Sequence, residues 1–527
     1  MGNYRLIIAI LLFFITEIIA SIPSKAKIDS SSRLYIEAET GRYRIFHGLA
    51  LENSGEPWYY ATYSSEQIKL LKQWGLNVVR SGFHWHMVES SPGQYNESYI
   101  QDVVDFVSTL NESGVYVIMD MHQDLWSPLF CGGHGIPSFD AHPYNTSDYK
   151  RGGKKAYPLP VAEPKYDPSG NVINCQDVLG GLFGWATGYV TYSTGAAAQR
   201  LYDNDGGILD RFGKFWQLIA SKLKQFPNVL GYELLNEPWL GNVPLSAEEF
   251  VPVNPHWNLW FPGVADKGNM KKLYETLHSY IREVDNDTII FFEPATGGNF
   301  LDGFHSGFEE GPGGPGYNDK QALSYHVYCL GVDTKKASTF LQEVIANLSV
   351  ASCDLLDDFL YDNRRDDVQR LSMAGFLTEF GNAGRGYVAE DIIDFATSKM
   401  DDFLHGWTYW YLTPDPNNLN PFEIKSLARP YVHALAGIPI KMNFDTNTRV
   451  FSLVYVPSDN ETTFALQSEV FVSEYYQYPT GFETTMVPAD SLKLTYDKTT
   501  YMMYWTHTTA AKLATEIEFT IQPKPTA

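Results

Sequence analysis

Short apolar runs alternate with longer amphipathic segments between about residue 42 and residue 412. Many of the short runs are almost continuously apolar, which is typical of strands buried on both faces of a parallel sheet. Strands and helices in this alternation predict a (β/α)8 barrel. The eight expected strands are Tyr43–Leu51, Asn77–Phe83, Val115–His122, Val229–Glu237, Thr288–Pro294, Ala322–Tyr328, Ala374–Phe380 and Trp407–Leu412.

The segments between these strands repeat apolar residues at helical spacing. One connection differs from the others, because about 80 residues rich in glycine, proline and aromatic side chains separate Gln123 from Asp205. A loop of this length usually serves a function, and in a barrel it emerges at the end where active sites lie. The expected helices are Ser65–Trp74, Tyr99–Leu110, Ile208–Gln225, Met270–Val284, Thr339–Leu360 and Val388–Phe403.

The pattern changes after Pro430, where short alternating runs follow one another without a helical segment between them. This pattern predicts a small antiparallel β-sandwich. We therefore expect residues 30–428 to form the barrel domain and residues 429–527 to form the sandwich domain. The expected sandwich strands are Phe451–Val456, Thr463–Val470, Ser491–Tyr496, Thr500–Thr506 and Glu516–Ile521.

The composition narrows the range of partners. The chain has 44% hydrophobic and 19% charged residues, which is the balance of a folded protein, and its net charge is -23. An acidic surface without a basic cluster repels phosphate backbones, so nucleic acid is excluded as a partner. The sequence shows no set of His, Asp and Glu residues with metal-ligand spacing, and we expect neither a metal nor a cofactor. The oligomeric state stays open.

The first twenty residues predict a secretory signal peptide. Arg5 supplies the positive charge, the stretch from Leu6 to Ala20 is mostly apolar, and a small residue precedes Ser21. The alternative is a membrane anchor, but the apolar stretch is shorter than the roughly 20 residues that a spanning helix needs. We therefore expect a secreted protein, in the extracellular space or in a lysosome-like or digestive compartment.

Four cysteines and six glycosylation sequons fit the secretory pathway. Three pairings of the cysteines are possible, and we prefer Cys131–Cys175 with Cys329–Cys353 because these bridges close the shortest loops. The asparagines of the six Asn-x-Ser/Thr triplets are Asn96, Asn111, Asn145, Asn286, Asn347 and Asn460.

Two glutamates stand at the ends of apolar strands of the expected barrel. Glu237 ends the fourth strand within Asn236-Glu237-Pro238, and Glu379 ends the seventh. Burying a carboxylate there is costly unless it has a function or a partner. The alternative is a salt-bridged structural glutamate. Because both strand tips face the same mouth, the pair fits glycoside hydrolysis, in which one carboxylic acid protonates the leaving oxygen and a second carboxylate attacks the sugar.

These motifs resemble glycoside hydrolase family 5, over about residues 40 to 415. The resemblance implies a retaining hydrolase with Glu237 as acid/base and Glu379 as nucleophile. It implies further roles for residues that match the family: Arg80 supports the nucleophile, Asn236 binds the sugar 2-hydroxyl, and Tyr328 hydrogen-bonds the nucleophile. The other matching positions are the strand-three histidine His122, the strand-six histidine His326 and the sugar-stacking platform Trp410.

A narrower resemblance comes from two stretches, residues 120–127 and residues 234–239. They are similar to the endoglycoceramidase branch of the family, whose members carry a C-terminal β-sandwich and release the intact glycan of a glycosphingolipid from ceramide. This resemblance implies that His122 and Asp124 bind the glucose next to the scissile bond. A lysine that contacts the sugar in some members is missing from the stretch Leu49–Gly55.

Other readings remain open at this point. A β-glucosidase or glucosylceramidase-like enzyme and an endo-β-glucanase share the same chemistry. A non-catalytic glycan- or lipid-binding protein would have lost a catalytic carboxylate, and both are present. A ceramide-cleaving enzyme needs an apolar groove and contacts a membrane or micelle surface transiently. The aromatic and apolar residues that either line such a groove or form a satellite core are Trp126, Leu129, Phe130, Leu182, Phe183, Trp185, Tyr189, Tyr192, Trp239, Trp257, Trp260 and Phe261.

Overall fold

The computed structural model describes most of the chain. The expected signal peptide, two of the sequons (Asn145 and Asn347), the Cys329–Cys353 bridge and nearly all of the expected helix Thr339–Leu360 lie outside the described residues. The described residues are 23–53, 55, 57–141, 165, 174–175, 188–189, 192–242, 263–296, 305–328, 358–381, 389–417 and 420–525.

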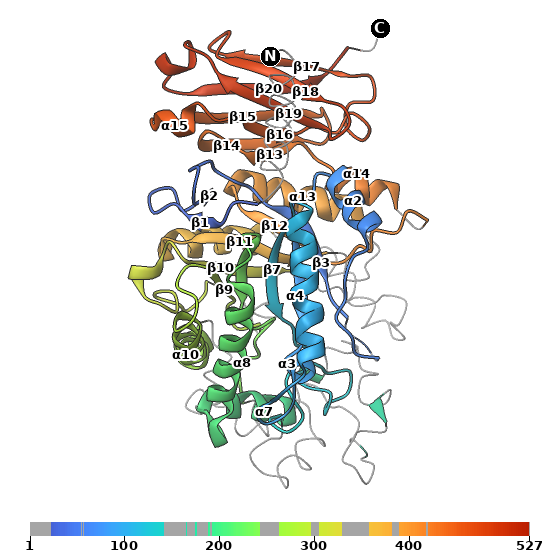
Figure 1. Cartoon of the computed structure of the whole chain (residues 1–527), viewed down its shortest axis with the longest axis vertical. Coiled ribbons are helices and arrows are strands. Elements are labelled where there is room, and N and C mark those ends of the chain that lie inside the picture. Colours follow the sequence, from blue (N-terminus) through green and yellow to red (C-terminus); the bar gives the residue numbers. More distant parts are fainter. Residues whose placement is uncertain are drawn as a thin grey trace, which may run out of the picture.

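Eight parallel strands close into a barrel in their order along the chain (Figure 1). The last strand pairs with the first, so every strand has two neighbours. Almost every residue of these strands is buried, as the continuous apolar runs predicted. The strands are β3 (His47–Leu51), β4 (Val78–Phe83), β7 (Tyr116–Met121), β8 (Val229–Glu233), β9 (Ile289–Phe292), β10 (Gln321–Val327), β11 (Ala374–Phe380) and β12 (Gly406–Tyr409).

Helices surround the barrel, and several of them begin after a residue whose side chain caps the helix. The helix after β3 begins with a capping box, in which the Ser64 hydroxyl and the Gln67 side chain each bond to the other residue's backbone N–H. The helices are α2 (Ser65–Gln73), α3 (Trp85–Val88), α4 (Glu97–Glu112), α7 (Tyr192–Asp203), η2 (Asp205–Gly207), α8 (Ile208–Leu223), η4 (Asp266–Met270), α10 (Lys271–Arg282), η5 (Pro315–Tyr317), residues 358–371, α13 (Ala389–Phe403) and α14 (Pro421–Leu427).

An N-terminal hairpin covers the end of the barrel where the strands begin. Its strands β1 (Ala26–Ile28) and β2 (Tyr35–Glu37) pair antiparallel. Ala26, Ile28 and Tyr35 share a buried cluster with side chains from the strands, including Phe46 and Tyr116. This end of the barrel is therefore filled by apolar packing. A second short hairpin joins β5 (Glu89–Ser91) to β6 (Gln94–Tyr95).

Two four-stranded antiparallel sheets follow the barrel, which confirms the predicted β-sandwich. Figure 1 shows them stacked at the barrel end that carries β1 and β2. One sheet has the order β13 (Tyr431–Ala434), β16 (Ser468–Phe471), β19 (Met502–His507) and β18 (Leu492–Asp497). The other has the order β14 (Gly437–Asp445), β15 (Val450–Pro457), β20 (Ile517–Pro523) and β17 (Phe482–Val487), and η7 (Ala511–Leu513) precedes β20.

One predicted strand of the sandwich begins too early. Residues 463–470 contain the end of a single helical turn, α15 (Glu461–Phe464), and β16 begins only at Ser468. The Asn460 side chain accepts hydrogen bonds from the backbone N–H groups of Thr462 and Thr463 and so caps this turn. The alternating apolar pattern predicts a strand from Thr463 onward, but the Asn460 cap stabilises a helical turn at its start.

A buried ion pair joins the barrel to the sandwich. Arg429, just before β13, places Nη2 2.5 Å from Oδ2 of Asp401 on α13, and both side chains are fully buried. The Asp401 carboxylate also accepts a hydrogen bond of 3.3 Å from the backbone N–H of Phe444 on β14. The pair therefore ties one barrel helix to the segment before β13 and to β14.

We expect Arg429→Met to lower the free energy of unfolding by about 3–5 kcal/mol, because it leaves the Asp401 carboxylate buried without its partner. Urea unfolding followed by circular dichroism measures the effect. The double variant Arg429→Met/Asp401→Leu should recover a large part of the loss. A single variant as stable as the parent would show that Asp401 is not held as a buried charge.

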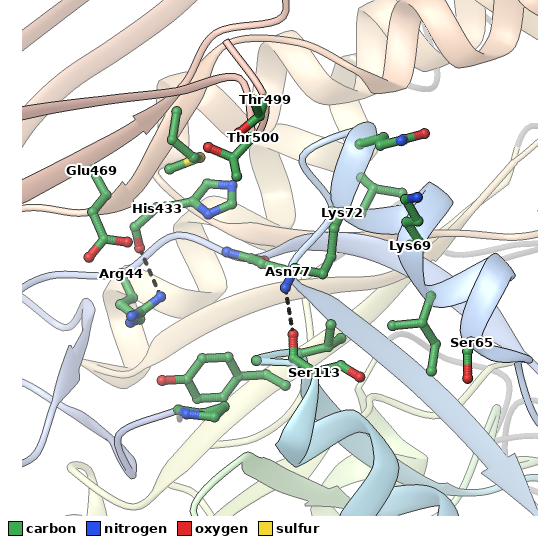
Figure 2. Close-up of a pocket in the computed structure, with 18 of the residues that line it drawn as sticks. Arg44, Ser65, Lys69, Lys72, Asn77, Ser113, His433, Glu469, Thr499 and Thr500 are labelled. Atoms are coloured by element: carbon green, nitrogen blue, oxygen red, sulfur yellow. Dashed lines mark hydrogen bonds between the residues drawn. The ribbon is translucent and has the colours of Figure 1, made fainter. Parts of the chain in front are cut away.

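A cavity of about 560 Å³ opens at the same junction (Figure 2). Lys72 Nζ donates to the backbone oxygen of Ser113 at 2.9 Å, and Arg44 Nη1 donates to that of His433 at 3.4 Å. Its walls include Asn77 at the start of β4, so the cavity lies at the opposite end of the barrel from the tips that carry the two glutamates. It is therefore separate from the site described next.

Candidate active site

The carboxyl ends of the barrel strands bring all nine expected catalytic and substrate-binding residues into one connected cluster. An oxygen of Glu237 and an oxygen of Glu379 lie within 4.8 Å of each other, with an imidazole nitrogen of His326 within the same distance of both. Carboxyl groups about 5 Å apart are typical of retaining glycoside hydrolases, because no water fits between the second carboxylate and the sugar. The geometry therefore favours a covalent glycosyl-enzyme over direct attack by water.

Two donors favour the ionised form of Glu379. Arg80 Nη1 lies 2.5 Å from Oε1, and the Tyr328 hydroxyl donates to Oε2 at 2.9 Å. The glycine that follows the strand lets the neighbouring chain come close, because a Cβ at Gly381 would lie 1.7 Å from the backbone oxygen of Trp410. Both oxygens of Glu379 are thus fixed, and its strand end packs directly against the expected sugar platform.

Arg80 is the centre of a buried charge network. Its Nε lies 2.5 Å from the Glu233 carboxylate. Its Nη2 donates to the side-chain oxygen Oδ1 of Asn236 at 2.7 Å and lies 3.1 Å from the Asp120 carboxylate. The side chain is 1% exposed. One guanidinium thus orients Glu379, the expected nucleophile, and Asn236, which is expected to bind the 2-hydroxyl, through the planar fork that lysine lacks.

The backbone around Glu237 leaves the strand before the glutamate. The strand was expected to continue to Glu237, but β8 ends at Glu233 and Glu237 has φ 41°. Gln123 supports this turn by donating from Nε2 to the backbone oxygens of Asn236 at 2.9 Å and Glu237 at 2.8 Å. Glu293 accepts the Glu237 backbone N–H at 3.2 Å. The strained position is therefore held from two sides.

Burial sets the protonation of the catalytic pair. It raises the pKa of Glu237 to about 7 and the pKa of Glu379 to about 7. Arg80 and Tyr328 bond to Glu379, whereas among the described residues the carboxyl group of Glu237 bonds to the imidazole of His326 alone, at 2.9 Å. Burial lowers the pKa of His326 to about 4, so this ring is neutral. The proton of the pair consequently lies on Glu237, as an acid/base requires, and the charge lies on Glu379.

The strand-three histidine lies between two carboxylates. His122 Nδ1 is 2.6 Å from Asp120, and its Nε2 contacts Glu52 and lies 3.5 Å from Asp124. Burial acts to lower the pKa of His122, but Glu52 and Asp120 raise it well above its usual value. His122 is thus an imidazolium whose neighbours, Asp124 and Asn236, are the residues expected to hold the sugar.

Glu52 is a site residue that the sequence analysis did not identify. It follows β3, inside the stretch where the family lysine is missing, and its Oε1 accepts the indole N–H of Trp410 at 3.1 Å. Burial acts to raise the pKa of Glu52, yet the His122 imidazolium lowers it to about 2. The Glu52 carboxylate thus fixes both the expected stacking platform Trp410 and the His122 imidazolium.

Replacing Glu52 by glutamine should lower kcat/KM by roughly 10- to 100-fold, the effect of losing one charge-assisted hydrogen bond. Glutamine keeps an acceptor for Trp410 but removes the charge that faces His122, so the pKa of His122 should fall. The pH dependence of kcat/KM and NMR titration of His122 measure these two effects. An unchanged titration with unchanged kcat/KM would show that Glu52 only fills space.

Glu293 also belongs to the site and was not expected from the sequence. It follows β9, is 2% exposed, and lies 3.7 Å from His326 Nε2. Burial and then the Glu233 carboxylate raise the pKa of Glu293 well above its usual value, so it is a neutral acid beneath Glu237. The same signal that identified Glu237, a carboxylate at the end of an apolar strand, was available for Glu293 in the sequence.

The proposed groove residues of the third connection and Trp239, which follows β8, pack in or against the core wherever the structure describes their side chains. The predicted Cys131–Cys175 bridge is present. Trp126, Tyr189 and Trp239 are almost fully buried, and Tyr189 donates to Asp124 at 3.2 Å. These three belong to the main hydrophobic core rather than to an apolar groove. The proposed groove residues that lie outside the described residues are Leu182, Phe183, Trp185, Trp257, Trp260 and Phe261; of Tyr192 the structure describes the backbone alone.

Comparisons with known proteins agree with this architecture. The cellulase model of glycosyl hydrolase family 5 matches residues 43–415, and the family 5 C-terminal domain model matches residues 429–518. An endoglycoceramidase of Hydra vulgaris is 30% identical over 94% of this chain and 90% of its own. One of Cyanea nozakii is 27% identical over 94% of this chain and 95% of its own.

A solved structure shares the whole fold. Endo-glycoceramidase II from Rhodococcus sp., in a complex with ganglioside GM3, superposes with a TM-score of 0.67 at 19% identity and covers 95% of this chain and 100% of its own. The chain therefore belongs to glycosyl hydrolase family 5 and, within that family, to the endoglycoceramidase branch.

Proposed function

We propose that this glycoside hydrolase is a retaining endoglycoceramidase that cleaves the β-glycosidic bond between the oligosaccharide and the ceramide of a glycosphingolipid. The observation that carries the reaction type is the pair of carboxyl groups within 4.8 Å at the barrel mouth. The assignment of ceramide as the aglycone is supported by similarity over 94% of the chain to relatives that are named endoglycoceramidases.

The proposed reaction has two steps at the same carbon. Glu379 attacks the anomeric carbon of the first glucose while Glu237 gives its proton to the ceramide oxygen, so the C–O bond breaks and ceramide leaves. Glu237, now ionised, then takes a proton from a water molecule that attacks the glycosyl-enzyme and releases Glu379. Asn236, held by Arg80, is placed to bind the 2-hydroxyl, and such a bond strengthens in the transition state.

Incubation with a ganglioside and analysis of both products tests the proposal. Intact oligosaccharide together with ceramide is the expected result. Glucose released from glucosylceramide alone would instead assign an exo-acting glucosylceramidase. Cleavage of cellulose oligomers with the ganglioside untouched would assign an endo-β-glucanase.

We also propose that the chain is a secreted glycoprotein. The Cys131–Cys175 bridge supports an oxidising compartment, and the sequon residues Asn286 and Asn460 are exposed. Among the described residues no helix has both the length and the apolarity needed to cross a bilayer. Expression in a eukaryotic host should place the protein in the medium, with a mass that falls on treatment with an N-glycosidase.

A further inference from the structure

A group of buried imidazole rings lies beside the expected sugar-binding residues. His134, from the segment just after Cys131, stacks on His122 with ring centroids 5.6 Å apart and an angle of 11° between the rings. His134 is 1% exposed, and neither ring nitrogen has a hydrogen-bond partner among the described residues. Leaving a buried polar ring without partners is costly. The catalytic reaction described above gives His134 no task, so the ring calls for another explanation.

The distances around Asp124 match those of a metal site. Asp124 Oδ2 lies 3.5 Å from His122 Nε2 and 3.6 Å from His134 Nε2. Tetrahedral ligands about 2.1 Å from a Zn²⁺ ion lie about 3.4 Å from one another. One ligand atom from each of the three residues falls within 4.8 Å of the other two. The backbone fixes this spacing, because the backbone N–H of His134 donates to the backbone oxygen of Asp124 at 2.8 Å.

The surroundings of the three side chains also suit a metal ion. Asp120 bonds to the other ring nitrogen of His122 at 2.6 Å, which is the carboxylate–histidine arrangement that orients metal-binding imidazoles. The Tyr189 hydroxyl bonds to Oδ1 of Asp124 and leaves Oδ2 for a ligand bond. The Asp124 side chain is 19% exposed, so an ion can reach it from the solvent.

We propose that His122 Nε2, Asp124 Oδ2 and His134 Nε2 form a binding site for a divalent transition-metal ion, with Zn²⁺ as the ion that best fits two imidazoles and a carboxylate. Binding replaces the proton by which His122 Nε2 contacts Glu52, and this proton is released to the solvent. Because His122 and Asp124 are expected to hold the sugar, a bound ion excludes it. This last consequence, inhibition, rests on the proposed function, whereas the metal site itself does not.

Calorimetric titration of the metal-free full chain with ZnCl₂ tests the site without any substrate. We expect His134→Gln to weaken binding of one Zn²⁺ by at least about tenfold, since one of three protein ligands is lost. The matched control is His86→Gln, because His86 packs in the same cluster but is not one of the three ligands. It should bind Zn²⁺ like the parent.

Three further measurements distinguish failure of the metal site from failure of the proposed function. Co²⁺ added to the parent chain should give the visible bands of a tetrahedral site, and His134→Gln should lack them; thermal unfolding of both chains checks that the variant folds. Zn²⁺ should inhibit glycosphingolipid cleavage competitively and EDTA should restore it. A parent chain without Co²⁺ bands, or equal Zn²⁺ affinity in the parent and in His134→Gln, would overturn the metal site. Zn²⁺ binding by a chain that cleaves no glycolipid would overturn only the proposed function.

Discussion

Glu379→Gln is expected to lower kcat on a glycosphingolipid by about 10⁴-fold or more, because an amide cannot form the glycosyl-enzyme and only binding and the remaining groups still contribute. The amide fits the same space, so the affinity for substrate should change little. Ceramide release under single-turnover conditions measures kcat, and calorimetry with the uncleaved glycolipid in micelles measures binding.

Two controls make this result specific for the nucleophile. Azide added to Glu379→Ala should restore turnover of an activated β-glycoside and yield the α-glycosyl azide, since azide then attacks from the nucleophile's side. The matched variant Glu89→Gln changes another buried glutamate, which accepts hydrogen bonds of 2.7 Å from the Trp85 indole N–H and from the Gly93 backbone N–H, and it should keep near-parental activity. Residual activity of Glu379→Gln within about tenfold of the parent would refute the assignment.

Glu237→Ala has the second largest expected effect, a loss of about 10²- to 10⁴-fold on natural glycolipids, the usual contribution of a general acid. An aryl glycoside with a good leaving group needs no proton, so its first step should be almost unaffected and the glycosyl-enzyme should accumulate. Azide should then give the β-glycosyl azide, because the intermediate on Glu379 is intact. Equal losses on both substrates would contradict the acid/base role.

The pH dependence follows from the same pair. Glu237 acts as the protonated acid, and burial raises its pKa to about 7, so activity should be lost as the pH rises through about 7. Glu379 acts as the carboxylate, so activity should be lost as the pH falls through its pKa. In Glu237→Ala, assayed with the aryl glycoside, the loss above pH 7 should disappear. A loss that persists at the same pH would belong to another group.

The barrel and its site could be predicted because their signals are local. Continuous apolar runs identified the eight strands, and a carboxylate at a strand end identified Glu237 and Glu379. Glu52 and Glu293 also stand at the ends of apolar strands. The sequence pattern does not show which of these glutamates bonds to an arginine side chain. That distinction needs Arg80, which approaches Glu379 from a different strand. Roles within a group of carboxylates thus depend on contacts between strands.

Other features depend on contacts that no periodicity reveals. β17 was missed because its residues, Phe482–Val487, are alternately exposed and half-buried and carry little apolar signal. The histidine His134 stands in a loop, and only the fold brings it against His122. From the sequence, Trp126 and Trp239 could either line a lipid groove or belong to the core. Both side chains are almost fully buried, so they belong to the core.

NMR observation of lactosylceramide hydrolysis, started with concentrated enzyme, tests the central claim most directly. Two carboxyl groups within 4.8 Å predict that the first sugar to appear is intact β-lactose, which then mutarotates, together with ceramide. α-Lactose as the first product would contradict the retaining mechanism. Free galactose or glucose as the first product would contradict cleavage between the glycan and ceramide.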